Sequence, residues 1–186
     1  MPRTRALTPA GERVLAAASE QFYRHGITAV GVAGIAEAAG VTKKTLYDCF
    51  GSKEELIVAY LRTRDARWWA YLERRLRDAK PPRALALYDS YLAQPGLDHS
   101  RGCGFLNGAA ELPSDHPGFK VIRAHKHAVR RRLAELIRTD QLAAANPEEL
   151  AEHLFLLLEG AVSHVGIEGD REPLRRARQI AADLLA

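Results

Sequence analysis

Apolar residues recur at helical spacing along most of the chain, and no alternating stretch predicts a strand. In the first such segment Val14, Ala18 and Phe22 share one helix face. Thr8 is placed to cap the start of this helix, and Gly26 is placed to end it. Alanine, leucine, arginine and glutamate dominate the sequence and favour helices. We therefore predict an all-α fold of about nine helices.

Capping residues, glycines and prolines delimit the predicted helices. Thr42 and Asn146 are typical N-caps, and Ser52 forms a capping box with Glu55 before the longest helix. A turn is expected at residues 166–170, before the last helix. The helices are predicted at residues 9–26, 32–39, 42–50, 53–79, 82–94, 105–112, 117–142, 147–165 and 172–185.

Residues 32–56 have the pattern of two short helices joined by a tight turn at Gly40 and followed by a long helix. In a helix-turn-helix the second helix enters the DNA major groove, with its N-terminal residues at base edges and phosphates. That second helix begins here with four hydrogen-bond donors: Thr42, Lys43, Lys44 and Thr45. We expect a helix-turn-helix DNA-binding domain at residues 1–52 and a larger helical body at residues 53–186, to which the family resemblance described below assigns effector binding and dimerisation.

The net charge of +4 is distributed unevenly along the chain. Residues 1–80 carry 14 lysines and arginines against 9 acidic residues, whereas residues 81–186 carry 13 against 14. A basic head favours a polyanionic partner and speeds association with it. Mild basicity alone would indicate only solubility, so the motif carries the argument.

Other function classes find little support. Cys49 and Cys103 lie far apart without metal-site spacing, and we expect both to be reduced in a cytoplasmic protein. The N-terminus has no apolar signal segment and no apolar run reaches membrane-spanning length, so no membrane partner is expected. No phosphate-binding glycine loop, nucleophile elbow or zinc-ligand cluster indicates an enzyme, a cofactor or a metal site. His125 and His127 are two residues apart and would share an ion poorly on a helix.

The chain resembles the tetracycline-repressor-type (TetR-type) transcriptional regulators over residues 9–60. The resemblance implies a homodimer whose small heads bind a palindromic DNA operator and whose body binds a small effector. Most members of the family repress transcription and release DNA when the effector binds. The residues that carry the resemblance are Phe22, Gly26, Val32, Ile35, Ala36, 39–42, 45–47, Phe50 and 52–56.

Seven residues are predicted to contact double-stranded DNA. Hydroxyl and ammonium groups at the start of the second short helix can donate to phosphates or base edges. Tyr47 resembles the family's phosphate-contacting tyrosine, and Lys53 lies at a helix N-terminus that attracts phosphate. The predicted contacts are Thr28, Thr42, Lys43, Lys44, Thr45, Tyr47 and Lys53.

Three features leave alternatives open in the head. The family usually has threonine or serine where Val30 and Gly31 stand, so we expect the second helix to begin without a side-chain cap. Asp48 either accepts from a cytosine amino group or repels phosphate. Arg3 and Arg5 belong either to an arm that reaches a neighbouring groove or to an unimportant tail.

The last two helices are the candidates for an isologous four-helix dimer interface, because their apolar surface is broader than one packing face requires. The alternative is that all of this surface is intramolecular core. The predicted interface residues are Leu154, Leu158, Ala161, Val162, Val165, Ala177, Ile180 and Leu184.

Aromatic residues and a few polar ones in the body predict a pocket for an aromatic or lipophilic effector, although any single aromatic is more often core than a ligand contact. Asn107 and Glu111 share a helix face, and Glu159 stands in an otherwise apolar helix, where a buried carboxylate needs a partner. The predicted effector residues are Trp68, Tyr71, Tyr88, Tyr91, Phe105, Asn107, Glu111, His125, Phe155 and Glu159. The main alternative function is a DNA-binding structural or nucleoid protein without effector response.

Overall fold

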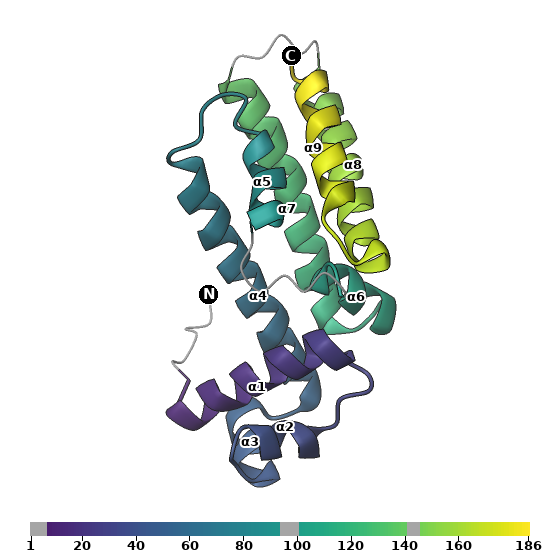
Figure 1. Cartoon of the computed structure of the whole chain (residues 1–186). Helices are drawn as coiled ribbons and strands as arrows, with labels where there is room; N and C mark the ends of the chain where they lie inside the picture. The colour runs from purple at the N-terminus through teal and green to yellow at the C-terminus, as the bar shows by residue number, and fades with distance from the viewer. Residues whose placement is uncertain (1–6, 94–100, 141–145) are drawn as a thin grey trace. The chain divides into compact units, whose positions relative to one another are not determined.

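The computed structural model describes residues 7–93, 101–140 and 146–186. Within these ranges the chain forms nine helices and no strand, which confirms the all-α prediction (Figure 1). The helices are α1 (Pro9–His25), α2 (Val32–Ala38), α3 (Lys43–Phe50), α4 (Lys53–Leu76), α5 (Leu85–Ala93), α6 (Gly104–Glu111), α7 (Pro117–Thr139), α8 (Pro147–Glu168) and α9 (Glu172–Leu184).

The predicted helix caps are confirmed by hydrogen bonds. Thr8 Oγ1 accepts from the Gly11 amide at 3.1 Å, and Ser52 Oγ accepts from the Glu55 amide at 3.0 Å. Thr42 and Asn146 cap α3 and α8 in the same way. By contrast, α2 begins without a side-chain cap, as expected, because its N-cap residue Gly31 has no side chain.

Several predicted boundaries were wrong by a few residues. Helix α4 ends at Leu76 rather than at residue 79, and α5 begins at Leu85 rather than at residue 82. Residues 82–84 instead form a tight turn, in which the Leu85 amide donates to the Pro82 carbonyl at 3.2 Å. Helix α7 ends at Thr139, and residues 141 and 142 of its predicted end lie outside the described residues.

The turn predicted at residues 166–170 was wrong in its first half. Helix α8 runs on to Glu168, and Gly169, in the left-handed conformation, ends it. Gly166 lies inside the helix, where a Cβ atom would stand 3.3 Å from the Gly102 amide nitrogen. Gly166 therefore permits a close backbone approach instead of ending the helix.

The chain forms two compact units. Unit 1 comprises residues 1–64 and 107–122, and unit 2 comprises residues 65–106 and 123–186. The domain boundary predicted at residues 52 and 53 stays a prediction. Unit 1 contains α1, α2, α3 and the first half of α4, and its fully buried side chains include Phe22, Ile35, Leu46, Leu56 and Leu61.

Unit 2 contains the second half of α4 with α5, α8, α9 and most of α7. Helix α9 packs on α8 and α5, and the Tyr88 hydroxyl in the core donates to the Leu154 carbonyl at 2.7 Å. Burial raises the pKa of Tyr88, because a phenolate would be desolvated there. The fully buried side chains of this unit include Leu72, Leu87, Tyr88, Leu133, Ile137, Leu154 and Leu158.

Helix α8 is, among the described residues, the one helix long and apolar enough to cross a membrane by length and composition. By this criterion the expectation that no apolar run reaches membrane-spanning length was wrong. Seven of its residues are nevertheless buried in the structure at helical spacing, starting from Ala151 and ending at Val165. This burial is that of an amphipathic core helix.

Candidate nucleic-acid interface and effector cluster

The helix-turn-helix is held together by a small apolar core. Ile35 and Ala36 of α2 and Leu46 of α3 are buried against α1. The turn between the two helices needs a positive φ, which Gly40 supplies at 62°. Across this turn the Val41 amide donates to the Ala36 carbonyl at 3.0 Å.

This packing leaves the polar face of α3 open to solvent. Thr42, Lys43 and Lys44 are exposed, and Tyr47 keeps 44% of its surface exposed. Thr45 is half-buried, and its hydroxyl lies 2.9 Å from that of Thr42. Tyr47 is therefore not a core residue, and its hydroxyl is available to a partner.

Asp48 is paired within α3. Its Oδ2 lies 2.8 Å from Lys44 Nζ, and this hydrogen bond, together with the charge of Asp48, raises the pKa of Lys44. Both side chains are largely exposed. Exposed i,i+4 pairs contribute little to stability, so another partner can replace this one at low cost.

Thr28 and Lys53 lie beside each other in unit 1. Lys53 Nζ donates to the Thr28 carbonyl at 3.5 Å and stands 6.0 Å from the centre of the Phe22 ring. The Thr28 amide donates to Glu111 Oε2 at 2.9 Å. The carboxylate of Glu111 also fills the space beside Gly26, where a Cβ would be 3.0 Å from it. Glu111 thus holds the turn after α1, and its predicted role at the effector pocket stays a prediction.

Four predicted effector residues come together inside unit 2. Phe105 stacks on the imidazole of His125, with ring centres 3.9 Å apart and 16° between planes. Trp68 meets the same imidazole edge-on at 5.0 Å, and it also contacts Tyr91 at 5.7 Å. Trp69 joins the cluster through the edge of Trp68. We call Trp68, Trp69, Tyr91, Phe105 and His125 the aromatic cluster.

His125 is 1% exposed and is oriented by Asp65, whose Oδ1 lies 2.8 Å from Nδ1. Burial lowers the pKa of His125, with a smaller opposing effect from the hydrogen bond to Asp65 and a lowering effect from nearby Lys126. The neutral imidazole that donates from Nδ1 to Asp65 keeps a lone pair on Nε2. Sequence reasoning missed Asp65, because nothing in its local pattern distinguishes it from a solvated helix residue.

Two nitrogen atoms of the aromatic cluster are buried without a hydrogen-bond partner among the described residues: His125 Nε2 and Trp68 Nε1. One is an acceptor in the neutral imidazole and the other is a donor. Buried polar atoms are nearly always paired in folded proteins. The cluster thus offers one free acceptor and one free donor in an apolar setting.

Glu159 has a lysine partner. Lys126 Nζ lies 2.6 Å from Glu159 Oε2 and 3.8 Å from Cys103 Sγ, and both charged side chains are mostly buried. Burial alone would lower the pKa of Lys126, but Cys103 and Glu159 outweigh it and raise that pKa. This ion pair explains how a carboxylate is accommodated in α8.

The other predicted effector residues have separate surroundings. Tyr88 is bonded to α8 in the core, the Tyr71 hydroxyl donates to the Ala93 carbonyl at 2.9 Å, and Arg130 stands 4.8 Å from the Phe155 ring. Asn107 is half-buried in unit 1. Their roles in binding an effector stay predictions.

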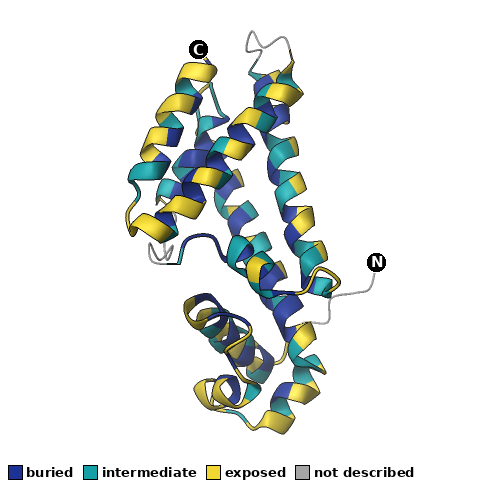
Figure 2. Ribbon diagram, turned by 90° about the vertical axis from the view of Figure 1, so that its right-hand side faces the viewer, coloured by how far each residue is buried: buried dark blue, intermediate teal, exposed yellow. Residues whose placement is uncertain are grey.

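The predicted dimer residues divide into two groups. Buried in the core of unit 2 are Leu154, Leu158, Ala161, Val162, Val165 and Ala177. Ile180 is 48% exposed and Leu184 is also exposed, as are Leu156 and Ile167, which the sequence analysis did not single out. Figure 2 shows exposed residues along the same side of α8 and α9. A hollow of about 380 Å³ lies between these helices and is bordered by Leu156 and Ile180.

Within the described ranges no three histidine, cysteine or acidic side chains are grouped so that they could hold a metal ion. Arg3 and Arg5 lie outside those ranges.

Comparison with known proteins identifies the family. The N-terminal profile of the bacterial regulatory proteins of the tetR family matches residues 14–60, and a tetracyclin repressor-like C-terminal domain profile matches residues 81–181, more than half of the chain. This chain belongs to the tetR family of bacterial regulatory proteins.

Similar members of the tetR family include the HTH-type transcriptional regulator RutR of Escherichia coli (strain K12), which is 28% identical over 168 residues, 87% of this chain and 76% of RutR. The crystal structure of SCO4454, a TetR-family transcriptional regulator from Streptomyces coelicolor, has a TM-score of 0.84 and 28% identity over 95% of this chain and 94% of that one. The reduced form of E. coli NemR has a TM-score of 0.78 and 26% identity over 96% and 99% of the two chains.

Membership of the tetR family settles the kind of function. The protein is a ligand-responsive, DNA-binding transcriptional repressor, and it is not an enzyme. Family members act as dimers on DNA operators and bind small-molecule effectors. A nucleoid protein without effector response is not favoured.

The lowered pKa of His125 predicts how stability depends on pH. Above the ordinary histidine pKa of 6.5 the imidazole is neutral in both the folded and the unfolded chain. Below it the unfolded chain takes up a proton that the folded protein resists, so the free energy of unfolding falls as the pH drops towards the lowered pKa. Urea unfolding between about pH 5 and pH 8 measures this slope.

The variant His125→Gln should lose part of this slope. His127→Gln, which removes an exposed histidine from the same helix, is the matched control and should keep it. Equal slopes in the wild type and His125→Gln would show that His125 does not carry the effect.

Proposed function

We propose that the open face of α3 contacts the operator through Thr42, Lys43, Lys44, Thr45 and Tyr47. The observation that carries the proposal is the exposure of three donors and of Tyr47 on one short helix, whose buried side rests on the core of unit 1. In helix-turn-helix proteins this helix lies in the major groove. A palindromic operator fits a symmetric dimer that presents two such helices roughly 34 Å apart.

Thr28 and Lys53 add a contact to the DNA backbone. Lys53 is half-buried against the Phe22 ring, which restricts its position, while Thr28 is exposed beside it. A phosphate near this pair would meet an ammonium group at the start of α4, where the helix dipole also favours an anion.

The Lys44–Asp48 pair suggests that Lys44 exchanges an internal partner, Asp48, for DNA. In the free protein Lys44 is held by Asp48, so phosphate must replace a carboxylate that is already in place. After the exchange the Asp48 carboxylate is free to accept from a cytosine amino group.

Replacing Lys43, Lys44 and Tyr47 with alanine should weaken operator binding by about 100-fold or more, because several phosphate or base contacts are lost together. The operator comes from selecting bound sequences out of random DNA, and a fluorescence anisotropy titration measures the affinity. Circular dichroism should show unchanged helicity, since all three side chains are exposed.

Lys120→Ala provides the matched control for the triple variant. It removes an exposed lysine of unit 1 that lies on α7, away from α3 in the sequence, and should change operator affinity by less than about twofold. Unchanged operator affinity in the triple variant would refute the assignment of α3.

We also propose that α8 and α9 pair two copies of the chain in an isologous interface. Leu156, Ile167, Ile180 and Leu184 are exposed apolar residues on these two helices, and clustered exposed apolar side chains mark interaction sites. The buried residues Leu154, Leu158, Val162 and Val165 support this surface from below, because they fix α8 to the core.

Ile180→Glu should convert the dimer to a monomer at micromolar concentration, since a charge would be desolvated at the interface. Light scattering coupled to size-exclusion chromatography measures the mass. The control Leu7→Glu places the same charge on an exposed leucine of unit 1 and should leave the mass unchanged. A monomeric wild-type protein would contradict the proposed interface.

For the effector, we propose a planar, largely apolar molecule that inserts into the aromatic cluster. It accepts a hydrogen bond from Trp68 Nε1 and donates one to His125 Nε2, the two buried atoms without a described partner. Phe105 and His125 are already stacked, so an aromatic effector can replace one ring contact with another. Trp68, Tyr91, Phe105 and His125 are buried, so the rings must separate when the effector enters.

Trp68→Phe should weaken effector binding about tenfold, because one buried hydrogen bond is lost. A thermal-shift screen of aromatic and lipophilic compounds identifies binders, and release of operator DNA identifies the effectors among them. Trp69→Phe is the matched control, since its indole nitrogen is not among the buried atoms that lack a partner. Effectors that bind both variants equally well would place the pocket elsewhere.

The burial of α8 within unit 2 supports a repressor that works in the cytoplasm without a membrane partner. The similar proteins RutR and SCO4454 are both transcriptional regulators, which fits the same location.

A further inference from the structure

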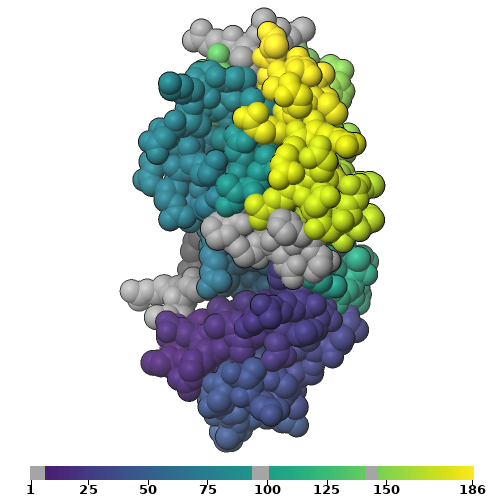
Figure 3. All heavy atoms as spheres, in the orientation of Figure 1, coloured from purple at the N-terminus to yellow at the C-terminus, as the bar shows by residue number. Residues whose placement is uncertain are grey.

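Unit 2 contains a second hollow, far larger than the one on α8 and α9. It measures about 700 Å³ and lies between the end of α4, the turn that follows it, α5 and α9. On the face shown in Figure 3, atoms from the end of α4 (teal) and from α9 (yellow) stand on either side of α5. Volumes of this order are typical of sites for small molecules.

Cationic side chains dominate the walls of this hollow. Four of them line it: Arg74, Arg75, Lys80 and Arg178. Asp89 is bound by Arg178 through two hydrogen bonds, of 2.5 and 3.3 Å, and so is already neutralised. Among the other charged residues of the lining, Asp78 is acidic, whereas Arg74, Arg75 and Lys80 are cationic. The hollow therefore carries a surplus of two positive charges.

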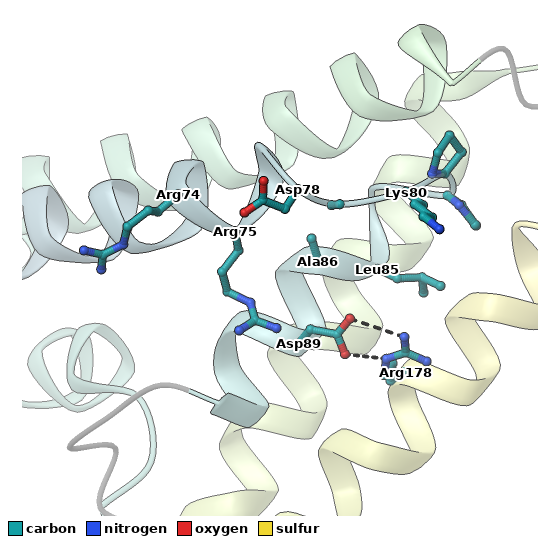
Figure 4. Close-up of a pocket in the computed structure, with 11 residues that line it drawn as sticks. Arg74, Arg75, Asp78, Lys80, Leu85, Ala86, Asp89 and Arg178 are labelled. Atoms are coloured by element: carbon teal, nitrogen blue, oxygen red, sulfur yellow. Dashed lines mark hydrogen bonds and ion pairs between the residues drawn. The ribbon is translucent and has the colours of Figure 1, made fainter.

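Figure 4 shows how these groups lie. The side chain of Arg75 extends from α4 towards Asp89 and Arg178, whereas Arg74 points away from them. Neither Arg75 nor Lys80 makes an ion pair with any residue in the described ranges. Leu85 and Ala86 of α5 supply apolar surface between the charged groups.

A favourable interaction with the helix dipole accounts for only some of the cations that line the hollow. Arg74 and Arg75 occupy the last turn of α4, where cations are favoured by the helix dipole. Lys80 lies beyond the helix end, so the dipole does not account for it. Like charges around one hollow repel each other, and an anion that binds there removes this cost.

We propose that this cleft binds a phosphorylated small molecule of about nucleotide size. Its phosphate oxygens lie between Arg75 and Lys80, where they accept hydrogen bonds from guanidinium and ammonium groups. Its less polar part rests on Leu85 and Ala86. The site is separate from the aromatic cluster, and the proposal depends neither on the operator contacts nor on the effector assignment.

Isothermal titration calorimetry of the full-length protein without DNA tests the site, with ADP, inorganic pyrophosphate and citrate as probes. ADP is expected to bind at one site per chain, more tightly than pyrophosphate because of its apolar part, and citrate more weakly than both. Raising the salt concentration should weaken all three, because the cleft is open to solvent.

Arg75→Glu should weaken ADP binding at least tenfold, because it removes a phosphate contact and adds a repelling carboxylate. Arg77→Glu is the matched control: it makes the same charge change two residues further on, at an exposed residue that does not line the cleft. It should change the affinity less than twofold. If Arg75→Glu fails to fold, as circular dichroism would show, Lys80→Glu takes its place.

Three outcomes would overturn the proposal. The first is the absence of ADP binding at millimolar concentration. The second is an equal loss in Arg75→Glu and Arg77→Glu, which would show unspecific attraction to a basic surface. The third is tighter binding of citrate than of ADP, which would assign the cleft to polycarboxylates. Operator binding by the same preparations shows separately whether the DNA-binding function is intact.

Discussion

The burial of Leu46 fixes the orientation of α3, the helix that we propose contacts the operator. Helix α3 has eight residues, and Leu46 is its one fully buried side chain, while Cys49 and Phe50 are half-buried. A helix this short is not stable alone in water, so packing must hold it. Because Leu46 lies on the inner side, Lys43, Lys44 and Tyr47 are turned outwards. One apolar anchor therefore sets which side chains α3 presents to solvent.

Local features of the structure could be predicted from the sequence, and contacts between distant residues could not. The caps at Thr8, Thr42 and Ser52 follow from a hydroxyl three residues before the amide that it accepts from. The bond between Glu111 and Thr28 joins residues 83 positions apart, and no local pattern signals it. The aromatic cluster shows the same limit: its rings were recognised as candidates, but the partner of His125 was not.

The proposed dimer surface illustrates a second limit. Hydrophobic periodicity shows that a residue prefers an apolar neighbour, but it does not show whether the neighbour belongs to the same chain. Leu154 and Leu156 are two residues apart on one helix, yet one is fully buried and the other is 58% exposed. Only the packing of α8 against its own unit separates them.

The contact between Gly102 and Gly166 has a mechanical consequence. The loop before α6 lies against the backbone of α8, and a Cβ on Gly102 would stand 3.2 Å from the Val162 carbonyl oxygen. Main chain touching main chain leaves no flexible side chain to absorb displacement, and packed interiors transmit strain. A shift of α8 would therefore be passed to residues 101–103 and on to Phe105, three residues after Gly102. In this way a close contact between two glycines would couple α8 to the ring stack on His125.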